Sequence, residues 1–185
     1  WNACRSKLYP QATGGNTPAG GFFHLIARPR KPQEHIMATL TFEVFSRFQS
    51  ATDANKLLYT PIADQLTYNH TRLYTIECEG DTEAAAAYMR SVLVDSISQK
   101  VQEDGTPALE GELFCISYGI KKGALDLEKE AILANYRGRT GLPFTISTLT
   151  ITQKVYIFGE GDREALSARF CKDVCNPAIH TWSVK

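Results

Sequence analysis

Apolar and polar residues alternate along several stretches of the chain after residue 36. Residues 40–48 show the two-residue period of a half-buried strand, and residues 71–78 and 113–120 follow the same rule. Downstream of residues 81 and 162, apolar residues instead recur at spacings of three and four, which predicts helices. The pattern therefore predicts a fold of the α+β class.

The strongest signal is an internal repeat. Residues 76–84 and 157–165 share the pattern I-x-x-E-G-D-x-E-A, and we call the constant separation of these copies, from Ile76 to Ile157, the repeat offset. Each copy follows a β-rich run and precedes a helical pattern, so its Gly-Asp step marks a turn from strand to helix. We expect Asp81 and Asp162 to cap these helices, because a carboxylate there accepts hydrogen bonds from free backbone N–H groups.

Matching elements surround both copies of the repeat. The expected first helices lie at 53–66 and 126–136, and the expected final strands at 96–101 and 178–184. Residues 144–158, rich in Thr, Ile and Val, are interpreted as an extended hairpin arm. With both helices on one face of its sheet, each copy is predicted to form a ferredoxin-like (βαββαβ) unit.

The predicted domain organisation is a tandem duplication. A first unit at 37–103 and a second at 112–185 are joined by a linker at 104–111, and each unit is expected to cover the apolar helix-free face of the other. Residues 1–36 contain no acid before Glu34 and are interpreted as an N-terminal extension. The alternative is an arm that docks on a partner through its apolar residues Phe22, Phe23 and Leu25.

Composition excludes several classes of protein. A hydrophobic content of 43% over 185 residues argues against global disorder, and 20 basic residues against 20 acidic ones give no field that attracts nucleic acid or membrane. The five cysteines lack C-x-x-C spacing, which argues against a disulfide framework and a zinc ribbon. Since no apolar run approaches a membrane span of about 18 residues, we expect a soluble, cytoplasmic protein.

Candidate chemistry is sparse. Cys171, Cys175 and His180 are too few for a closed metal site, and both cysteines are expected in the core. His70 and His180 fall in or beside strands and are interpreted as structural, so no catalytic residue, metal or cofactor is predicted. Tyr136 and Trp182 are interpreted as core aromatic residues, and the alternative for both is a position at an interface.

The loop at 135–141 is the segment with the most functional character. It combines Asn135, Arg137 and Arg139 with two glycines after a helix, a composition that can hold a phosphate or carboxylate group. The structural alternative is a solvated helix terminus capped by Gly138.

Two short motifs stand out in the second unit: residues 122–132 read K-G-A-L-D-L-E-K-E-A-I, and residues 175–179 read C-N-P-A-I. They resemble the K-x-G-V-L-D-P-Q-G-x-A-I segment and the A-N-P-V-I ending of PurS, the small subunit of bacterial phosphoribosylformylglycinamidine synthase of purine biosynthesis. Residues 141–143 and 155–157 resemble the turn and the strand between these motifs. At 127–129 Leu, Glu and Lys replace the family's Pro, Gln and Gly. The first unit is similar to the family only because it shares the internal repeat with the second unit.

The resemblance implies a bridging subunit without an active site of its own. PurS-like proteins dimerise and connect a glutaminase subunit to an ATP-dependent synthetase subunit, helping ammonia to reach the formylglycinamide ribonucleotide. The tandem chain would resemble a fused PurS dimer, with a further homodimer possible and the 144–158 arm serving assembly. Four residues are expected to face a partner or a phosphate: Asp126, Asn135, Arg137 and Arg139.

Two other classes of function fit the same elements. A pocket enzyme of the dimeric α+β barrel, small monooxygenase-like type would hold His70 or His180 in an apolar pocket. A ligand-binding or structural interaction module would bind a small molecule or another chain at its sheet edges.

Overall fold

A computed structural model describes residues 37–62 and 65–185, so the expectations for residues 1–36 lie outside the described residues. In chain order the elements are β1 (Met37–Ser46), β2 (Thr52–Asp53), the 3-10 helix η1 (Ala54–Leu57), β3 (Thr67–Gly80), α1 (Thr82–Leu93), β4 (Gln99–Gln102), β5 (Phe114–Ile120), α2 (Leu127–Arg137), β6 (Phe144–Phe158), α3 (Arg163–Val174) and β7 (His180–Val184). The α+β class is confirmed.

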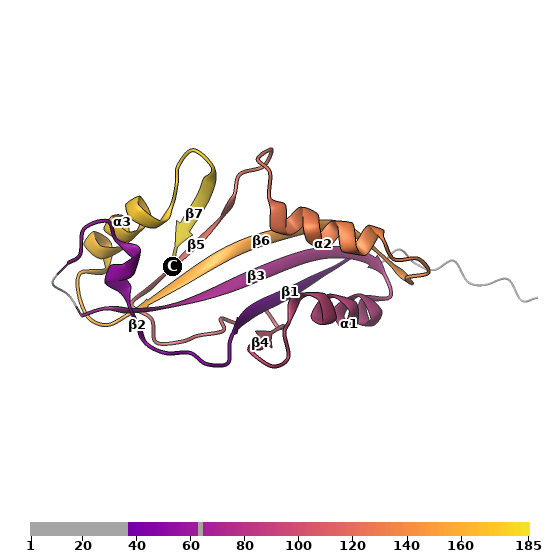
Figure 1. Ribbon diagram of the computed structural model, residues 1–185, viewed down its shortest axis with the longest axis horizontal. Helices are drawn as coiled ribbons and strands as arrows, with labels where there is room; N and C mark the ends of the chain where they lie inside the picture. Colours follow the sequence, from indigo (N-terminus) through magenta and orange to yellow (C-terminus); the bar gives the residue numbers. More distant parts are fainter. Residues whose placement is uncertain (1–36, 63–64) are drawn as a thin grey trace, which may run out of the picture. The chain divides into compact units, whose positions relative to one another are not determined.

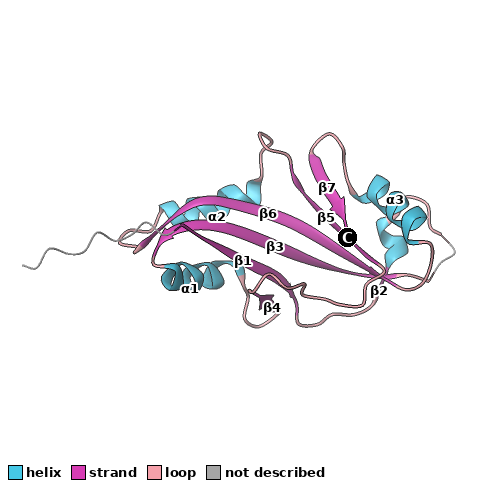
Figure 2. Ribbon diagram, turned by 180° about the vertical axis from the view of Figure 1, so that it is seen from behind, coloured by secondary structure: helices cyan, strands magenta, loops and turns pink. Residues whose placement is uncertain are grey.

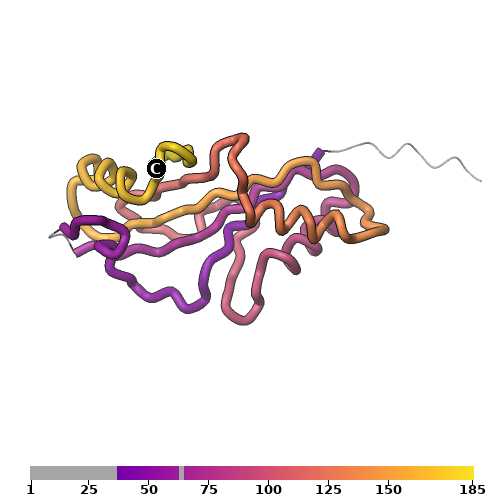
Figure 3. Tube along the Cα trace, turned by 45° about the horizontal axis from the view of Figure 1, so that its top comes forward, coloured from indigo at the N-terminus to yellow at the C-terminus, as the bar shows by residue number. Residues whose placement is uncertain are grey.

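The described strands form one antiparallel sheet of seven strands (Figure 1). Its order is β4-β1-β3-β6-β5-β7, with β2 paired to β3. The two longest strands, β3 and β6, lie side by side along their whole length, as the ribbon and the Cα trace both show (Figures 1 and 3). The first half of the chain, 37–103, thus meets the second half, 112–185, edge to edge.

The two halves share one strand order, but each has fewer strands than predicted. The strand order β4-β1-β3 of the first half matches β7-β5-β6 of the second. Helix α3 begins and ends one repeat offset after α1 along the chain. Among the described residues each half supplies three strands besides the short β2, whereas a ferredoxin-like unit has four.

The predicted helix caps are confirmed. The Asp81 side chain accepts a hydrogen bond from Ala84 N–H at 2.9 Å, and Asp162 accepts from Glu164 and Ala165 N–H. The first helix of the second half is also confirmed as α2, which Asp126 caps through Lys129 N–H. These caps satisfy N–H groups that a helix start leaves without a partner.

The helix expected at 53–66 is wrong. The short strand β2 and the single turn η1 take its place. Pro61 lacks an N–H group and disfavours helical geometry in the residue before it, so a helix cannot run through this segment. The Asn55 side chain accepts a hydrogen bond from Ile62 N–H at 2.7 Å and holds the chain in a loop.

The hairpin arm expected at 144–158 is also wrong. β6 is a single strand that pairs with β3 on one side and β5 on the other. The segment contains no Gly, Pro, Asn or Asp, the residues that a tight hairpin turn requires.

Two apolar clusters lie on one face of the sheet, at opposite ends. Leu149 and Ile151 belong to the cluster under α1 and α2, and Val155 and Ile157 to the cluster with η1 and α3. All four are odd-numbered positions of β6, and side chains two residues apart share a face. Figure 2 shows the helices at the two ends of the long strands.

The aromatic and sulfur-containing positions expected in the core give mixed outcomes. Cys171 and Cys175 are buried in the second cluster, and Tyr136 packs on the first, as expected. Trp182 is 43% exposed, so its placement in the core is wrong. Its strand, β7, is an edge of the sheet and pairs only with β5 among the described strands.

The opposite, helix-free face of the sheet is polar. Because side chains alternate between faces, it receives Thr39, Thr41 and Thr75 from the first half and Thr150 and Thr152 from the second. The expectation that each half covers an apolar face of the other is wrong, because the threonines leave little apolar area to bury.

A buried carboxylate joins the two halves across this polar face. Glu43, 2% exposed, accepts hydrogen bonds from Thr71 and from Tyr156 at 2.6 Å each, and from Lys154 Nζ at 2.7 Å. Burial on its own raises the pKa of Glu43, but the bonds from Lys154, Thr71 and Tyr156 outweigh it and place the pKa below 4.5. Burial and the bond to Glu43 raise the pKa of Tyr156.

Removing this carboxylate is expected to destabilise the joint. Glu43→Ala leaves the Lys154 ammonium in a buried place without its partner, which costs about 3 kcal/mol in free energy of unfolding. The depressed pKa means that the contribution of Glu43 is complete above pH 4.5 and is lost as pH falls through the folded-state pKa. Urea unfolding curves at several pH values measure both effects.

The matched control is Thr148→Ala, an exposed position on β6. It should change the free energy of unfolding by no more than about 0.5 kcal/mol. The double variant Glu43→Leu with Lys154→Met should be more stable than either single change, since it removes both charges together. Equal unfolding midpoints for Glu43→Ala and the unmodified chain would contradict the assigned role.

Candidate functional site

The helix-bearing face of the sheet is open in its middle, between the two apolar clusters. The β3 side chains of His70 and Arg72 and the β6 side chain of Gln153 lie there. Arg72 and Gln153 are directly opposite each other in the β3–β6 register. They are also separated in the chain by the repeat offset, so the local twofold axis that relates the halves passes between them.

A cavity of about 340 Å³ lies beside this axis, toward the second half; we call it the joint cavity. Strands β3, β5, β6 and β7 and the start of α2 supply its walls. Its lining residues are His70, Arg72, Tyr118, Gly119, Ile120, Asp126, Glu128, Ile151, Gln153 and His180. The volume suits a small molecule.

Glu128 organises one wall of the joint cavity. One of its oxygens accepts the Tyr74 hydroxyl at 2.6 Å and lies 3.4 Å from an Arg72 nitrogen. Burial and the bond to Glu128 raise the pKa of Tyr74 to about 12, so this hydroxyl remains a donor at neutral pH. Asp126 uses one carboxylate oxygen to cap α2.

His70 is held in its neutral form. The protein around it excludes water from the charged ring, and Arg72 adds a neighbouring positive charge, so the pKa lies below 6.5. Gln153 and Glu128 act in the opposite direction but do not cancel these effects. A neutral imidazole can accept a proton or a hydrogen bond at neutral pH.

His180 presents a donor to the same cavity. Its Nδ1 accepts a hydrogen bond from Asn176 N–H at 3.1 Å, so the proton of the neutral ring is on Nε2. The ring packs against Tyr118 at a centroid distance of 5.1 Å. The pair gives the cavity an aromatic wall with a polar edge.

Gln153 supplies the least satisfied group of the site. Its side-chain oxygen is buried and makes no hydrogen bond of good geometry with a described residue, although the Gln153 side chain lies near enough to His70 to act on the pKa of that ring. Together with the free oxygen of Asp126 it offers acceptors, while Arg72 and His180 offer donors. The joint cavity can thus bind a small polar molecule and exchange a proton with it through His70.

A second cavity of about 300 Å³ lies on the other side of the axis. It shares His70 and Arg72 with the joint cavity. When the strand pairings of the two halves are aligned, its residues Val44 and Gln99 hold the positions that Tyr118 and His180 hold in the joint cavity. The two cavities are therefore related by the local axis, and only the joint cavity carries the aromatic and imidazole pair.

The four residues predicted from the sequence are split between three places. Asn135 and Arg139 line a crevice of about 650 Å³ between α1 and α2, which has no acidic residue in its lining. Asp126 lies in the joint cavity at the other end of α2. Arg137 instead lies 3.8 Å from Glu130 on an exposed face of the same helix.

The loop after α2 also has the structural role that was its alternative interpretation. The N–H of Gly138 donates to Ala134 at 3.1 Å and ends the helix, while Tyr88 donates its hydroxyl to Asn135 at 2.8 Å. The guanidinium group of Arg139, beyond the cap, makes no hydrogen bond or ion pair with any described residue, so it remains available to an anion.

Other candidate chemistry finds no support in the part of the chain that the structure describes. Cys171 and Cys175 are free, and burial raises the pKa of Cys175 to about 11, which keeps this thiol protonated. Within residues 37–62 and 65–185 no three His, Cys, Asp or Glu side chains gather as metal ligands do. None of the described helices is long and apolar enough to cross a membrane.

Comparisons with known proteins identify no relative. The chain matches no protein-family model, no curated protein and no solved structure. Function is therefore argued from the geometry of the chain's own residues.

Sequence patterns do not indicate most of the joint cavity. They favour a structural role for His70 and His180, with a pocket only in the enzyme alternative, and they single out none of Arg72, Tyr118 and Gln153. One signal was available, because the repeat offset places Arg72 and Gln153 at equivalent positions of the two copies. The strand register that brings them face to face depends on contacts distant in sequence.

The pKa of His70 can be tested directly. Its side-chain signal in NMR titration should have a midpoint below 6.5. Arg72→Ala should move the midpoint upward, because it removes a repelling positive charge and leaves Glu128 unpaired beside the ring. Arg163→Ala, at the exposed start of α3, is the matched control and should leave the midpoint in place; an unchanged midpoint in Arg72→Ala would refute the assignment.

Proposed function

We propose that this chain is a non-catalytic bridging subunit of a glutamine-dependent phosphoribosylformylglycinamidine synthase, formed by two tandem copies of a PurS-like unit. The observation that carries the proposal is the symmetric joint, in which two halves of equal plan continue one sheet through β3 and β6. A pair of like units fused in this way is what the resemblance leads us to expect of a PurS dimer in one chain.

Equivalent hydrogen bonds support the duplication. Arg47 N–H donates to Ser98 at the end of β1, and Lys121 N–H donates to Ile179 at the end of β5, both at 2.8 Å. Ser98 and Ile179 are separated by the repeat offset, like the two copies of the sequence pattern. Fixed backbone contacts at matching positions favour two copies of one unit over a chance likeness.

The two ends of the sheet suit two different partners. Over the first cluster the full helix α2 lies with α1, whereas over the second the single turn η1 lies with α3. The α1–α2 crevice offers the free Arg139 and Asn135, the residues expected to face a partner or a phosphate. A continuous sheet between unlike ends can hold two proteins at a fixed spacing and raise their effective concentration.

The proposal is tested by reconstitution. The chain is added to the glutaminase and ATP-dependent synthetase subunits of a PurS-type complex that lacks its small subunit. It should raise the glutamine-dependent rate of phosphoribosylformylglycinamidine formation by about tenfold or more, because it holds the two active sites together. The ammonia-dependent rate should not change, since that reaction does not need the glutaminase.

Variants locate the contact. Arg139→Glu, which reverses the free charge of the α1–α2 crevice, should lower the glutamine-dependent rate and the amount of complex in gel filtration. Arg163→Glu reverses an exposed charge outside the crevice and serves as the matched control. A chain that neither joins the two subunits nor changes the glutamine-dependent rate would rule the proposal out.

A second candidate function is favoured by the joint cavity. Both His70 and His180 line it, as a pocket enzyme or a ligand-binding module would require, although its walls are mixed rather than apolar. A small-molecule screen by NMR separates the two functions, since ligand-induced shifts confined to Tyr118, Gln153 and His180 favour binding in the cavity.

A further inference from the structure

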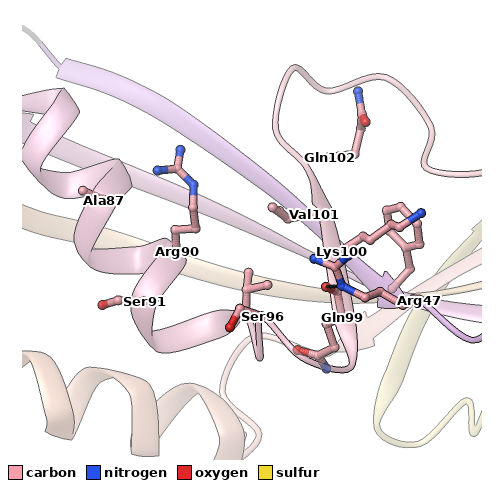
Figure 4. Close-up of a pocket in the computed structure, with 11 residues that line it drawn as sticks. Arg47, Ala87, Arg90, Ser91, Ser96, Gln99, Lys100, Val101 and Gln102 are labelled. Atoms are coloured by element: carbon pink, nitrogen blue, oxygen red, sulfur yellow. Dashed lines mark hydrogen bonds between the residues drawn. The ribbon is translucent and has the colours of Figure 1, made fainter.

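A large cleft lies at the edge of the sheet, outside the joint cavity. It has a volume of about 860 Å³ and separates α1 from the edge strand β4 (Figure 4). Figure 4 shows Ala87 and Ser91 on the helix, with Arg47 and Lys100 beside the strand. The lining residues are Phe45, Arg47, Ala87, Arg90, Ser91, Val94, Ser96, Gln99, Lys100, Val101 and Gln102.

The outer edge of β4 has free backbone groups at Val101 only, because the other outward residue, Gln99, donates its N–H to Asp95 at 2.8 Å and accepts from Arg47 at 2.9 Å. The strand pairs only with β1 among the described strands. Because Arg47 N–H donates to the Ser98 carbonyl, every second residue after Ser98 has its backbone N–H and C=O groups directed at β1. Lys100 and Gln102 therefore direct their backbone groups at β1, whereas Val101 directs its N–H and C=O groups outward. No described residue hydrogen-bonds the backbone of Val101, so the cleft contains a free donor and acceptor in strand geometry.

The cleft is positively charged. It is lined by three basic residues and no acidic one. Arg90 is neutralised by Glu103, at 2.6 and 2.7 Å, but Lys100 has no ion pair with any described residue. Arg47 uses one nitrogen on the Gln99 carbonyl at 2.9 Å and has the rest of its guanidinium group free.

The two sides of a strand added to β4 would meet different chemistry. Val101 points to the helix-bearing face, where Ala87 and Val94 leave a small apolar space, and Lys100 points to the opposite face. Alternate residues of an added strand would therefore meet apolar atoms on one side and an ammonium group on the other.

We propose that the cleft binds an extended acidic segment of a partner protein as an additional strand on β4. Backbone bonds to Val101 supply affinity, small apolar side chains enter between Val101 and α1, and acidic side chains face Lys100 and Arg47. The inference does not rest on the bridging proposal, because strand addition requires only the free edge and the charge of this cleft.

The chain's own segments fit the cleft less well. Residues 1–36 contain five basic residues and a single acid, Glu34, so their charge opposes that of an acidic ligand. Pairing of β4 with β4 of a second copy would place Lys100 and Arg47 beside their own counterparts, which repel them. An acidic partner segment is the occupant that charge complementarity selects.

The probe is a fluorescein-labelled octapeptide of alternating Val and Glu, titrated with the full chain and followed by fluorescence anisotropy. Val101→Pro removes only the outward N–H group, which an edge strand tolerates, and should weaken binding about tenfold. Val101→Ala keeps that N–H group and should weaken binding less than about threefold. Binding should also weaken as salt is raised, because the attraction is between charges.

A second variant protects the test against misfolding. Lys100→Glu leaves the β4 backbone intact and should weaken binding of the Val-Glu peptide while favouring a Val-Lys peptide. The proposal fails if Val101→Pro folds and binds as the unmodified chain does, if Val-Lys and Val-Glu peptides bind equally, or if sedimentation shows that β4 is occupied by a second copy. Loss of peptide binding would leave the glutamine-dependent reconstitution unaffected, so the two proposals fail separately.

Discussion

The pairing of β3 with β6 is the constraint on which the rest of the structure depends. It is the only ladder between the halves in the described sheet, and the buried Glu43 carboxylate stabilises it by binding Lys154 and Tyr156 of the second half. A slip of one residue would send every side chain of a strand to the other face. It would also leave a buried charge without partners, so the charge pairing stabilises the observed strand register.

This joint explains where the functional chemistry lies. Each end of the sheet is covered by one helix from each half, α1 with α2 and η1 with α3, and the middle of the same face, over the joint, stays open. The two halves place cavities at matching positions on both sides of the axis, with different side chains in their walls. Arg72 faces Gln153, and Tyr118 and His180 occur where the first half has Val44 and Gln99, so the packed Tyr118–His180 pair lines only the joint cavity of the two.

The sequence predicts a feature well when the residues that determine it are close together in the chain, and poorly when they are far apart. The caps at Asp81 and Asp162 and the helices behind them are set by neighbours a few residues away, and their prediction is confirmed; the cap at Asp126 is equally local, but that residue is expected from the sequence to face a partner or a phosphate. The segment 53–66 was predicted as a helix because the breaking effect of Pro61 was given too little weight. The joint cavity was not predicted because its residues meet only through a strand register fixed by the Glu43 network, although the repeat offset already paired Arg72 with Gln153.

The two edges of the sheet are unlike, and this asymmetry bears on what the molecule does. Lys100 and Arg47 lie along β4, while β7 exposes Trp182 at 43% and Val184 at 39% and contains no Asp, Glu, Lys or Arg. Charged edge strands resist pairing with other edges, whereas exposed apolar edges invite it. The edge at β4 is therefore basic and the edge at β7 is apolar, so the two edges of the described sheet differ in the chemistry that they expose.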